Sequence, residues 1–218
     1  MEFYSGGIAR VDPTHPLVRG LQAFAVGPHL VWGGNARVTG TAAPVVGRYG
    51  RAVVGDNLGI SMGAFPAQTD STSFTLMLVA ATTTAEGGIG YRNGGGPGTS
   101  FCKLTPGNAS NATPKINYMV NGASRSADAT ALGAQPGQHV VIAVKNGLTL
   151  DLWVDGRLGA SNTWTTGQLT KNAATCYYGP DETVGANVEL LCGGFWPNIG
   201  LRRADIAALS RNPLQFVE

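Results

Sequence analysis

The stretch HVVIAVKNGLTLDLWVDGRL, residues 139–158, constrains the fold of this chain more than any other part of the sequence. Two runs of alternating apolar residues flank Asn146-Gly147, and Asp155-Gly156 ends the second run. Both dipeptides suit two-residue hairpin turns, because Gly adopts positive φ freely and Asn and Asp tolerate it. The stretch therefore predicts an antiparallel hairpin closed by a second tight turn.

The second run of this hairpin places its side chains on two faces. One face is a row of apolar residues, and the other is polar except for one tryptophan, which predicts a half-buried strand. We expect the apolar row in the core and the polar face toward solvent or a covering element. The apolar row is Leu148, Leu150, Leu152 and Val154, and the opposite face is Thr149, Asp151, Trp153 and Asp155.

The rest of the chain contains short apolar runs separated by glycine-rich turns, the pattern of an all-β sandwich or barrel. The run SFTLMLVAATTT (73–84) is apolar on both faces, as expected of a central strand that is covered on both sides. Further strands are predicted at 17–26 with 29–32, 115–120, 175–178 and 188–192.

One helix is predicted, near residues 202–210. Ile206 and Leu209 have the i, i+3 spacing that allows a helix to dock on a core, and Asn212-Pro213 ends the pattern. We expect an extended N-terminal arm at residues 1–16, because Pro13 and Pro16 favour extended backbone before them. A single domain is expected over residues 17–218.

Charge and hydropathy exclude several classes of protein. Only 13% of the 218 residues are charged, the net charge is +2, and basic residues never cluster beyond pairs. A nucleic-acid partner recognised through phosphates would require a basic stripe. No apolar run reaches about 18 residues, so membrane insertion is not expected. The N-terminus lacks the features of a signal peptide, so we expect synthesis in a cytosol.

The three cysteines, Cys102, Cys176 and Cys192, match no zinc-binding or redox motif. Cys176 and Cys192 would face each other if residues 174–193 formed one hairpin. The alternative is three buried, reduced thiols, which is the state favoured in a chain made in a cytosol.

Several segments together resemble laminin-G-like and pentraxin-like jelly rolls. In that family a Gly-x-His opens one strand and the next ends in aromatic-Val-Asp-Gly, as in Gly137–Leu158 of this chain. GRYGRAVVGDNLGISM (47–62) resembles the family's Gly-Arg-Phe-Gly-x-Ala entry strand, and SFTLMLVAATT resembles its Phe-Thr-hydrophobic strand. The ending LRRADIAALSRNPLQFVE resembles the closing segment of phage and bacterial versions, whereas ELLCGGFWPNIG (189–200) departs from the family pattern.

The resemblance implies a concanavalin A/laminin-G-like jelly-roll β-sandwich with a short C-terminal helix. Its Asn-Pro-x-Gln-Phe ending resembles phage-encoded domains, which implies a virion protein assembled in the host cytoplasm. We expect it to contact other virion proteins as a homo-oligomer or as part of a large assembly. In this interpretation residues 1–16 are an attachment arm that orders on a partner.

The resemblance also implies a place for calcium, although the fold requires no cofactor. The loop GPDETVGAN (179–187) falls where pentraxin-like relatives carry calcium-binding acids. Asp181 and Glu182 could supply two of the 6–8 oxygen ligands that calcium takes, with Asp56-Asn57 or Asp70 adding others. The alternative is a solvated polar turn.

Some relatives of this fold are glycoside hydrolases, which need two carboxylates about 5–9.5 Å apart. Asp151 and Asp155 share one strand face but are four residues apart, which corresponds to roughly 13 Å at ~3.3 Å per residue. We therefore expect no catalytic residue and no enzymatic activity. His139 begins a strand where the family has a structural histidine, and we expect a packing role for it.

The remaining candidates are ligand-binding residues. Trp153, with Asp151 beside it, could stack a sugar ring or bury against a neighbour, or it could pack beneath a covering element. Trp32, Trp164 and Trp196 lie beside turn residues and could be rim aromatics. Two functions remain open: a non-enzymatic virion protein acting by surface contact, in a capsid decoration or in a tail or baseplate adhesin, and a carbohydrate-binding lectin module.

Overall fold

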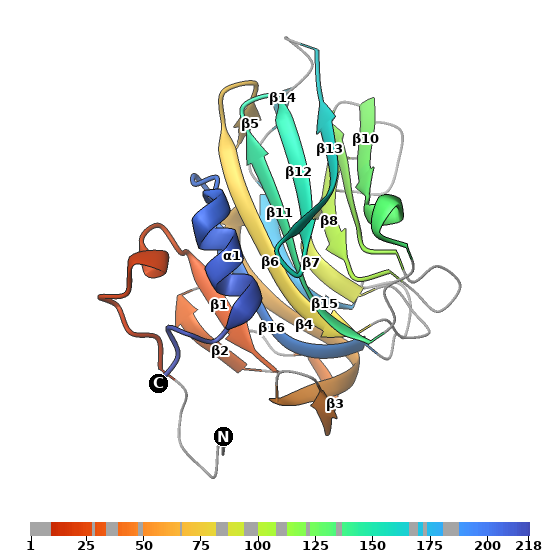
Figure 1. The fold of residues 1–218 in the computed structure, drawn as a ribbon. Coiled ribbons are helices and arrows are strands. Elements are labelled where there is room, and N and C mark those ends of the chain that lie inside the picture. The colour runs from red at the N-terminus through yellow and green to blue at the C-terminus, as the bar shows by residue number, and fades with distance from the viewer. Residues whose placement is uncertain are drawn as a thin grey trace.

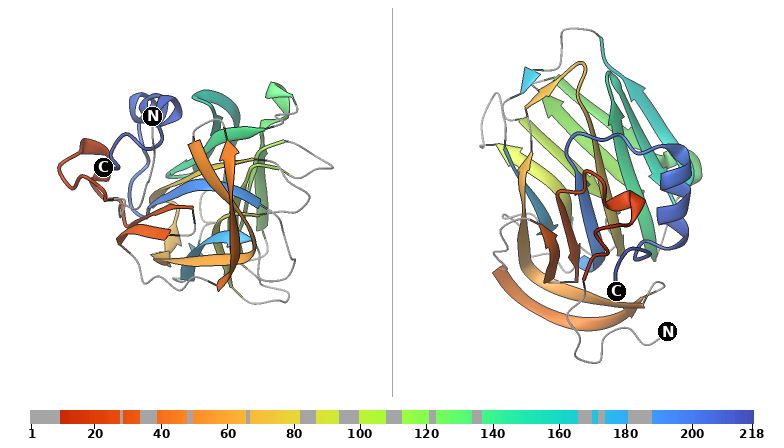
Figure 2. Two further views of the ribbon diagram at one scale, coloured as in Figure 1. Left: turned by 90° about the horizontal axis from the view of Figure 1, so that it is seen from below. Right: turned by 90° about the vertical axis from the view of Figure 1, so that its left-hand side faces the viewer.

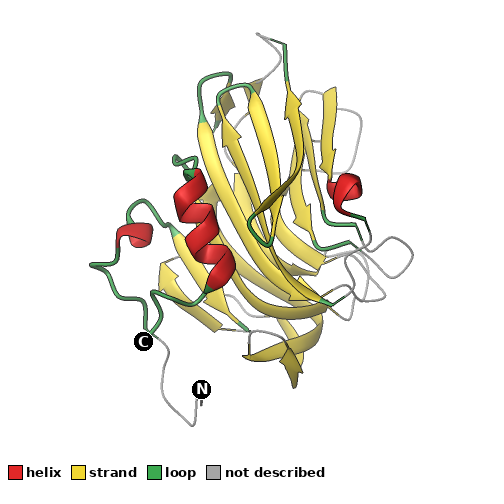
Figure 3. Ribbon diagram, in the orientation of Figure 1, coloured by secondary structure: helices red, strands yellow, loops and turns green. Residues whose placement is uncertain are grey.

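The computed structural model describes residues 10–27, 29–33, 39–47, 50–65, 67–81, 87–93, 100–107, 113–120, 123–133, 137–165, 170–171, 174–180 and 188–218. The prediction of an all-β chain with one short C-terminal α-helix is confirmed, as Figures 1 and 3 show. The elements are η1 (Pro16–Val18), β1 (Ala23–Val26), β2 (His29–Gly33), β3 (Thr39–Gly47), β4 (Gly50–Phe65), β5 (Gln68–Thr69), β6 (Ser73–Ala81), β7 (Gly87–Asn93), β8 (Ser100–Thr105), β9 (Lys115–Val120), β10 (Ala123–Asp128), η2 (Ala129–Leu132), β11 (Gln138–Asn146), β12 (Thr149–Val154), β13 (Arg157–Thr163), β14 (Thr170–Lys171), β15 (Ala174–Pro180), β16 (Val188–Trp196) and α1 (Arg203–Arg211).

Most strands form two antiparallel layers that share the long strand β4; β3 pairs with β4 outside these layers, and β5 and β14 form a separate pair. One layer has the order β2-β1-β16-β6-β11-β12-β13, and the other has the order β10-β9-β8-β7-β15-β4. The first half of β4 pairs with β16 through Val53–Gly55, and its second half pairs with β15 through Ile60–Phe65. The strand therefore passes from one layer to the other, and the fold is a jelly-roll β-sandwich.

The predicted hairpin at residues 139–158 is confirmed and forms one end of the first layer. β11 and β12 pair from Val141↔Val154 to Asn146↔Thr149, and β13 continues after the Asp155-Gly156 turn. Asp155 has φ of 47°, the left-handed conformation that this turn requires.

Strand β6 is central and covered on both faces, as its sequence predicts. It pairs with β16 on one side and β11 on the other, and its residues from Phe74 to Ala80 are fully buried. Alternate side chains enter two separate cores, one between the layers and one on the outer face of the first layer. We call these the inner core and the outer core.

The inner core contains a chain of aromatic contacts. The Phe65 and Phe195 rings stack at 4.9 Å, Phe65 meets Phe74 edge-on at 5.1 Å, and Tyr118 packs edge-on against Trp164 at 5.1 Å. Trp164 is 3% exposed, so its prediction as a rim aromatic is wrong: the ring fills the space between the layers.

The outer core is closed by α1 and by the segments near both ends of the described chain (Figure 2). The predicted docking residues Ile206 and Leu209 are buried at 2% and 0% exposure, and the helix ends with Asn212 as its C-cap. Trp196 is also fully buried here, so its prediction as a rim aromatic is wrong as well.

The described part of the predicted N-terminal arm, residues 10–16, lies on the domain. Val11 forms an antiparallel bridge with Val217, and the Arg10 and Glu218 backbones exchange hydrogen bonds of 3.1 and 2.7 Å. Residues 1–9 lie outside the described residues, so the predicted role of the arm in attachment concerns a segment about which the structure gives no information.

The three cysteines are free and buried. Residues 174–193 do not form one hairpin, because β15 pairs with β4 and β7 instead of β16. The condition under which Cys176 and Cys192 would face each other is therefore not met, and the favoured alternative of three buried thiols is confirmed. Burial raises the pKa of the Cys176 and Cys192 thiols, which keeps them protonated and weakly reactive. Among the residues described, no helix is both long and apolar enough to span a membrane.

Candidate binding surface beside the helix

The two predicted ligand-binding residues, Asp151 and Trp153, lie on the outer face of β12. Cross-strand pairing places Asp151 opposite Ser161 and places Trp153 opposite Leu158 on β13. A bulge between these two pairs leaves Gly159 as the extra residue on β13. A Cβ at Gly159 would lie 2.7 Å from Ala129 of η2, which explains why the bulge carries glycine.

The outer face of β12 and β13 is only partly covered. In Figure 1, α1 crosses the same layer beside β6, and β12 and β13 lie to its right. Leu158 is 48% exposed, the Ser161 and Thr163 side chains are exposed, and Thr149 and Asp151 are half-buried. We call this surface the polar strip and define it by Thr149, Asp151, Leu158, Ser161 and Thr163.

The carboxylate of Asp151 is held in place by its cross-strand neighbour. The Ser161 hydroxyl donates a hydrogen bond of 2.6 Å to Asp151 Oδ1. The Thr149–Thr163 pair lies next along the two strands, so its hydroxyl groups are on the same face and to one side of this carboxylate. A fixed carboxylate can accept hydrogen bonds from the hydroxyl groups of a bound molecule, and the neighbouring Ser and Thr hydroxyl groups can donate or accept them.

Trp153 lies at the border between the polar strip and the helix. It is 9% exposed, packs in the outer core, and has the Arg203 guanidinium carbon 6.0 Å from its ring centre. The sequence left open whether Trp153 stacks a sugar ring, contacts a neighbouring subunit or packs beneath a covering element. The structure shows the third arrangement, with α1 as the covering element. Its buried Nε1 has no hydrogen-bond partner among the residues that the structure describes.

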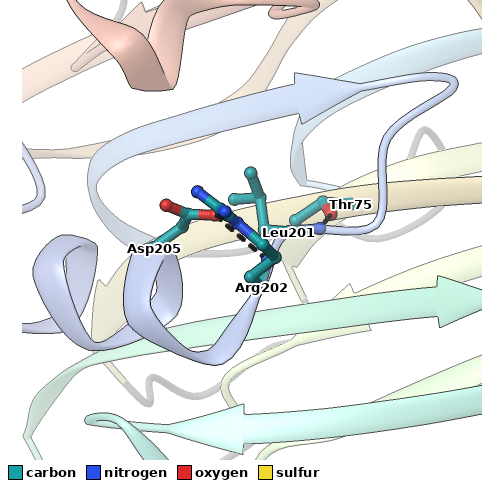
Figure 4. A network of polar contacts seen from close by, with 4 residues as sticks. All are labelled: Thr75, Leu201, Arg202 and Asp205. Carbon is teal, nitrogen blue, oxygen red and sulfur yellow. Dashed lines mark hydrogen bonds and ion pairs between the residues drawn. The ribbon is translucent and has the colours of Figure 1, made fainter.

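The segment before α1 is anchored to the first layer, as Figure 4 shows. The buried Thr75 hydroxyl donates to the Ile199 carbonyl at 2.8 Å and accepts from the Leu201 amide at 3.0 Å. At the helix start, Asp205 Oδ2 accepts hydrogen bonds of 3.2 Å from both N and Nε of Arg202. These contacts fix where the helix begins and leave Arg203 over Trp153.

Asp155 stabilises the turn between β12 and β13. Its Oδ1 accepts a hydrogen bond of 3.0 Å from the Val140 amide, and its Oδ2 lies 2.7 Å from His139 Nδ1. The predicted structural role of His139 is confirmed, because the ring links the start of β11 to the turn after β12. Asp151 and Asp155 are thus engaged with different neighbours.

The predicted calcium ligands Asp181 and Glu182 lie outside the described residues, and so does the side chain of Asp56. Within the part of the chain that the structure describes, no group of three or more His, Cys, Asp or Glu side chains is placed to hold a metal ion. The calcium site stays a prediction.

One buried cation was not anticipated from the sequence. Lys145 is fully buried, and its Nζ donates hydrogen bonds to the Thr69 and Thr72 carbonyls and, at 3.2 Å, to the Thr72 hydroxyl. Burial lowers the pKa of Lys145 to about 8, and the nearby Asp70 opposes this shift. Lys145 follows Val141 and Ala143 on the inward face of β11, so the alternation contained a signal that a charge is buried there.

Sequence reasoning also missed Ser161, Leu158 and Arg203. The two-residue turn at Asp155-Gly156 predicts the pairing of Trp153 with Leu158, so this exposed leucine could have been found. Ser161 could not, because the bulge shifts the register by one residue before it. Arg203 could not either, since the docking of a helix on a sheet depends on contacts far apart in the chain.

No protein-family model matches this chain, and no curated protein matches it.

Solved structures do match over most of the chain. Domain 4 of AbnA, an extracellular arabinanase from Geobacillus stearothermophilus solved with arabinotriose, is 14% identical with a TM-score of 0.62, over 87% of this chain and 98% of that one. The binding domain of Paraclostridial Mosquitocidal Protein 1 is 12% identical with a TM-score of 0.63, and the receptor-binding domain of botulinum neurotoxin D is 14% identical with a TM-score of 0.61. The matches cover 89% and 90% of this chain but 52% and 53% of the two toxin domains. At these identities the likeness shows the fold, and this chain has the jelly-roll β-sandwich seen in these domains.

Proposed function

We propose that this chain is a non-enzymatic binding domain that acts by surface contact, and that its ligand is a carbohydrate bound at the polar strip. The observation that carries the proposal is the exposed Asp151–Ser161 pair, whose 2.6 Å hydrogen bond holds a carboxylate in a fixed position. A fixed acceptor loses little conformational entropy when a ligand binds, which favours recognition of a hydroxyl-rich molecule.

The surroundings of this pair support the same ligand class. Thr149 and Thr163 add hydroxyl groups on one side, and Leu158 adds an exposed apolar side chain on the other. A sugar ring presents both hydroxyl groups and apolar C–H faces, so a site that combines the two suits it. The match to an arabinanase domain solved with arabinotriose, and to toxin domains named for binding, supports a binding role for this fold here.

A hydrolytic function is the weaker alternative. Asp155 is bonded to the Val140 amide and to His139, and Asp151 is bonded to Ser161, so neither carboxylate has the other as its neighbour. Retaining and inverting glycosidases need such a pair across the scissile bond. Release of reducing sugar from a panel of bacterial polysaccharides would contradict the non-enzymatic part of the proposal.

A glycan array tests the binding part. Purified wild-type domain is compared with Ser161→Ala, which releases the Asp151 carboxylate, and with Asp151→Asn, which removes its charge. Thr130→Ala, at an exposed position on η2, serves as the control. We expect reproducible hits for the wild type and control that are lost in both strip variants; an array on which the wild type binds no glycan would refute the proposal.

We further propose that the domain belongs to a phage virion and contacts other virion proteins as part of a larger assembly. The similarity of Asn212-Pro213-x-Gln215-Phe216 to phage-encoded endings supports this location. Neighbouring genes for head or tail proteins would agree with the proposal, and neighbouring genes for sugar metabolism would oppose it. Calorimetric titration with calcium, compared with Asp181→Asn, tests the predicted metal site.

A further inference from the structure

Three kinds of hydrogen-bond donor occur where α1 approaches β12, at the contact between Arg203 and Trp153. The first is the indole Nε1 of Trp153, which is buried without a partner among the described residues, in a side chain that is 9% exposed. The indoles of Trp32 and Trp196, in contrast, donate to the Leu21 and Leu17 carbonyls at 3.1 and 2.8 Å. A buried donor without a partner is uncommon, and Trp153 Nε1 is one of a few such side-chain atoms among the described residues.

The second set of donors is the start of α1, a helix of nine residues. The first amides of a helix have no partner within it, and the helix dipole makes this end favourable for negative charge. Here the Ile206 amide donates the first helical hydrogen bond, to the Arg202 carbonyl at 3.0 Å. The Arg202 amide donates to the Asp205 carboxylate. No bond within the helix satisfies the amides of Arg203 and Ala204.

The third donor is the Arg203 guanidinium, which lies over the Trp153 ring. Arg203 is exposed and makes no ion pair with any carboxylate that the structure describes. Asp205 is the acidic residue in the first turn of α1. Its carboxylate accepts hydrogen bonds of 3.2 Å from the backbone N and the side-chain Nε of Arg202. The positive charge of Arg203 is therefore not neutralised by its own helix.

We propose that this seam binds an oxyanion carried by a saccharide, a carboxylate or a sulfate group, through Arg203, the first-turn amides of α1 and the Trp153 indole. The inference rests on the proposed function and names the class of sugar. The Arg203 side chain is exposed and moves off the ring to admit the anion, which then accepts a hydrogen bond from Trp153 Nε1. Leu158, paired with Trp153 on β13, lies against the sugar ring.

The test is a titration of ¹⁵N-labelled protein followed through its indole N–H resonances, of which the chain has four. The probes are a glucuronate-containing oligosaccharide, a sulfated oligosaccharide, a neutral glucose oligosaccharide and sodium sulfate. We expect one indole resonance, identified by its absence in Trp153→Phe, to move with the charged saccharides and to stay in place with the neutral one. Whether the carboxylated or the sulfated probe binds tighter distinguishes the two anions.

Arg203→Gln is expected to weaken binding of the charged saccharide by about tenfold, the loss of one charge-assisted hydrogen bond. Arg211→Gln, at the other end of the same helix, is the matched control and should bind as the wild type does. An unmoved Trp153 resonance, or equal affinity of wild type and Arg203→Gln, would overturn the inference.

The titration also separates this inference from the proposed function. Binding of neutral glycans at the polar strip without any effect on Trp153 leaves the proposed function standing and refutes the anion site. If sodium sulfate moves the Trp153 resonance while no saccharide binds, the seam binds a free oxyanion only, and both the carbohydrate function and the saccharide named in this inference fail.

Discussion

Two seams close the outer core of this domain, and they differ in whether their tryptophan indoles are hydrogen-bonded. The terminal seam, where η1, β1 and residues 10–12 meet residues 214–218 and β16, pairs its indoles and its backbone. The helix seam, where α1 meets β11 and β12, leaves Trp153 Nε1 and the Ser210 hydroxyl without partners among the described residues. In the terminal seam the side-chain Nε2 of Gln215 is also buried without such a partner, so the contrast concerns the indoles. Both seams bury similar apolar side chains in one continuous core.

We infer from this difference that the two seams have different roles. Buried polar groups are almost always hydrogen-bonded, so an indole that is already bonded within the fold offers no donor to a ligand. An unbonded donor beside an exposed cation and an exposed leucine marks the place where a ligand can add bonds that the fold lacks. The terminal seam holds the domain together, and the helix seam is the side on which we place recognition.

The largest loss of stability is expected from a substitution in the terminal seam. Phe216 is 1% exposed and meets Phe24 edge-on with ring centres 4.8 Å apart, so Phe216→Ala should lower the free energy of unfolding by about 3–5 kcal/mol. Leu158→Ala, in an exposed position beside the helix seam, should change it by less than about 0.5 kcal/mol. Urea unfolding of the two variants gives both values, and equal losses would contradict the comparison.

A matched pair of tryptophan substitutions sharpens the comparison. Trp196→Phe leaves the Leu17 carbonyl buried without its donor and should cost about 1–3 kcal/mol. Trp153→Phe removes a donor that has no partner, so its cost should stay within about 1 kcal/mol. Thermal and urea unfolding measure the difference, which would be absent if Trp153 were as fully bonded as Trp196.

Lys145 is a further buried polar group, an ammonium that is fully hydrogen-bonded and lies outside both seams, between the two layers. Burial lowers its pKa to about 8 in the folded protein, so from about pH 8 to 10.5 the unfolded chain binds more protons than the folded one. Stability should therefore rise with pH in this window, by about 1–2 kcal/mol, relative to Lys145→Met. Unfolding of both proteins at pH 7, 8, 9 and 10 checks the sign, and a falling difference would contradict the buried position of the ammonium.

The smallest expected effect on stability is at the polar strip. Ser161→Ala removes an exposed hydrogen bond and should change the free energy of unfolding by about 0.5 kcal/mol or less. The same substitution is expected to reduce glycan binding, because the Asp151 carboxylate is no longer held in place. A loss of stability as large as the loss of binding would make Ser161 a structural residue instead.

The sequence predicted what depends on neighbours along the chain. The Asn146-Gly147 and Asp155-Gly156 turns set the order of β11, β12 and β13, and the two-sided apolar pattern of 73–84 identified the central strand. The i, i+3 pair Ile206 and Leu209 gave the docking face of α1. Each of these features follows from local periodicity or turn chemistry.

Features that depend on distant pairing were not predictable. Residues 174–193 look like one hairpin in the sequence, but β4 is long enough to pair with both β15 and β16 and so separates them. The surroundings of Trp153 depend on where α1 docks, which the alternation within β12 does not contain. The candidate site was therefore found as two residues, Asp151 and Trp153, without the Ser161 and Arg203 that give them their roles.

Hydrogen exchange of the indole N–H groups in the free protein tests the two-seam account most directly. The Trp196 N–H is bonded in the terminal seam, so it should exchange only through global unfolding, whereas local opening of the helix seam should expose the Trp153 N–H. In ²H₂O, with resonances assigned from Trp153→Phe and Trp196→Phe, we expect Trp153 to exchange about tenfold faster or more. Equal protection of the two indoles would show that the helix seam is as closed as the terminal seam, and would contradict the account.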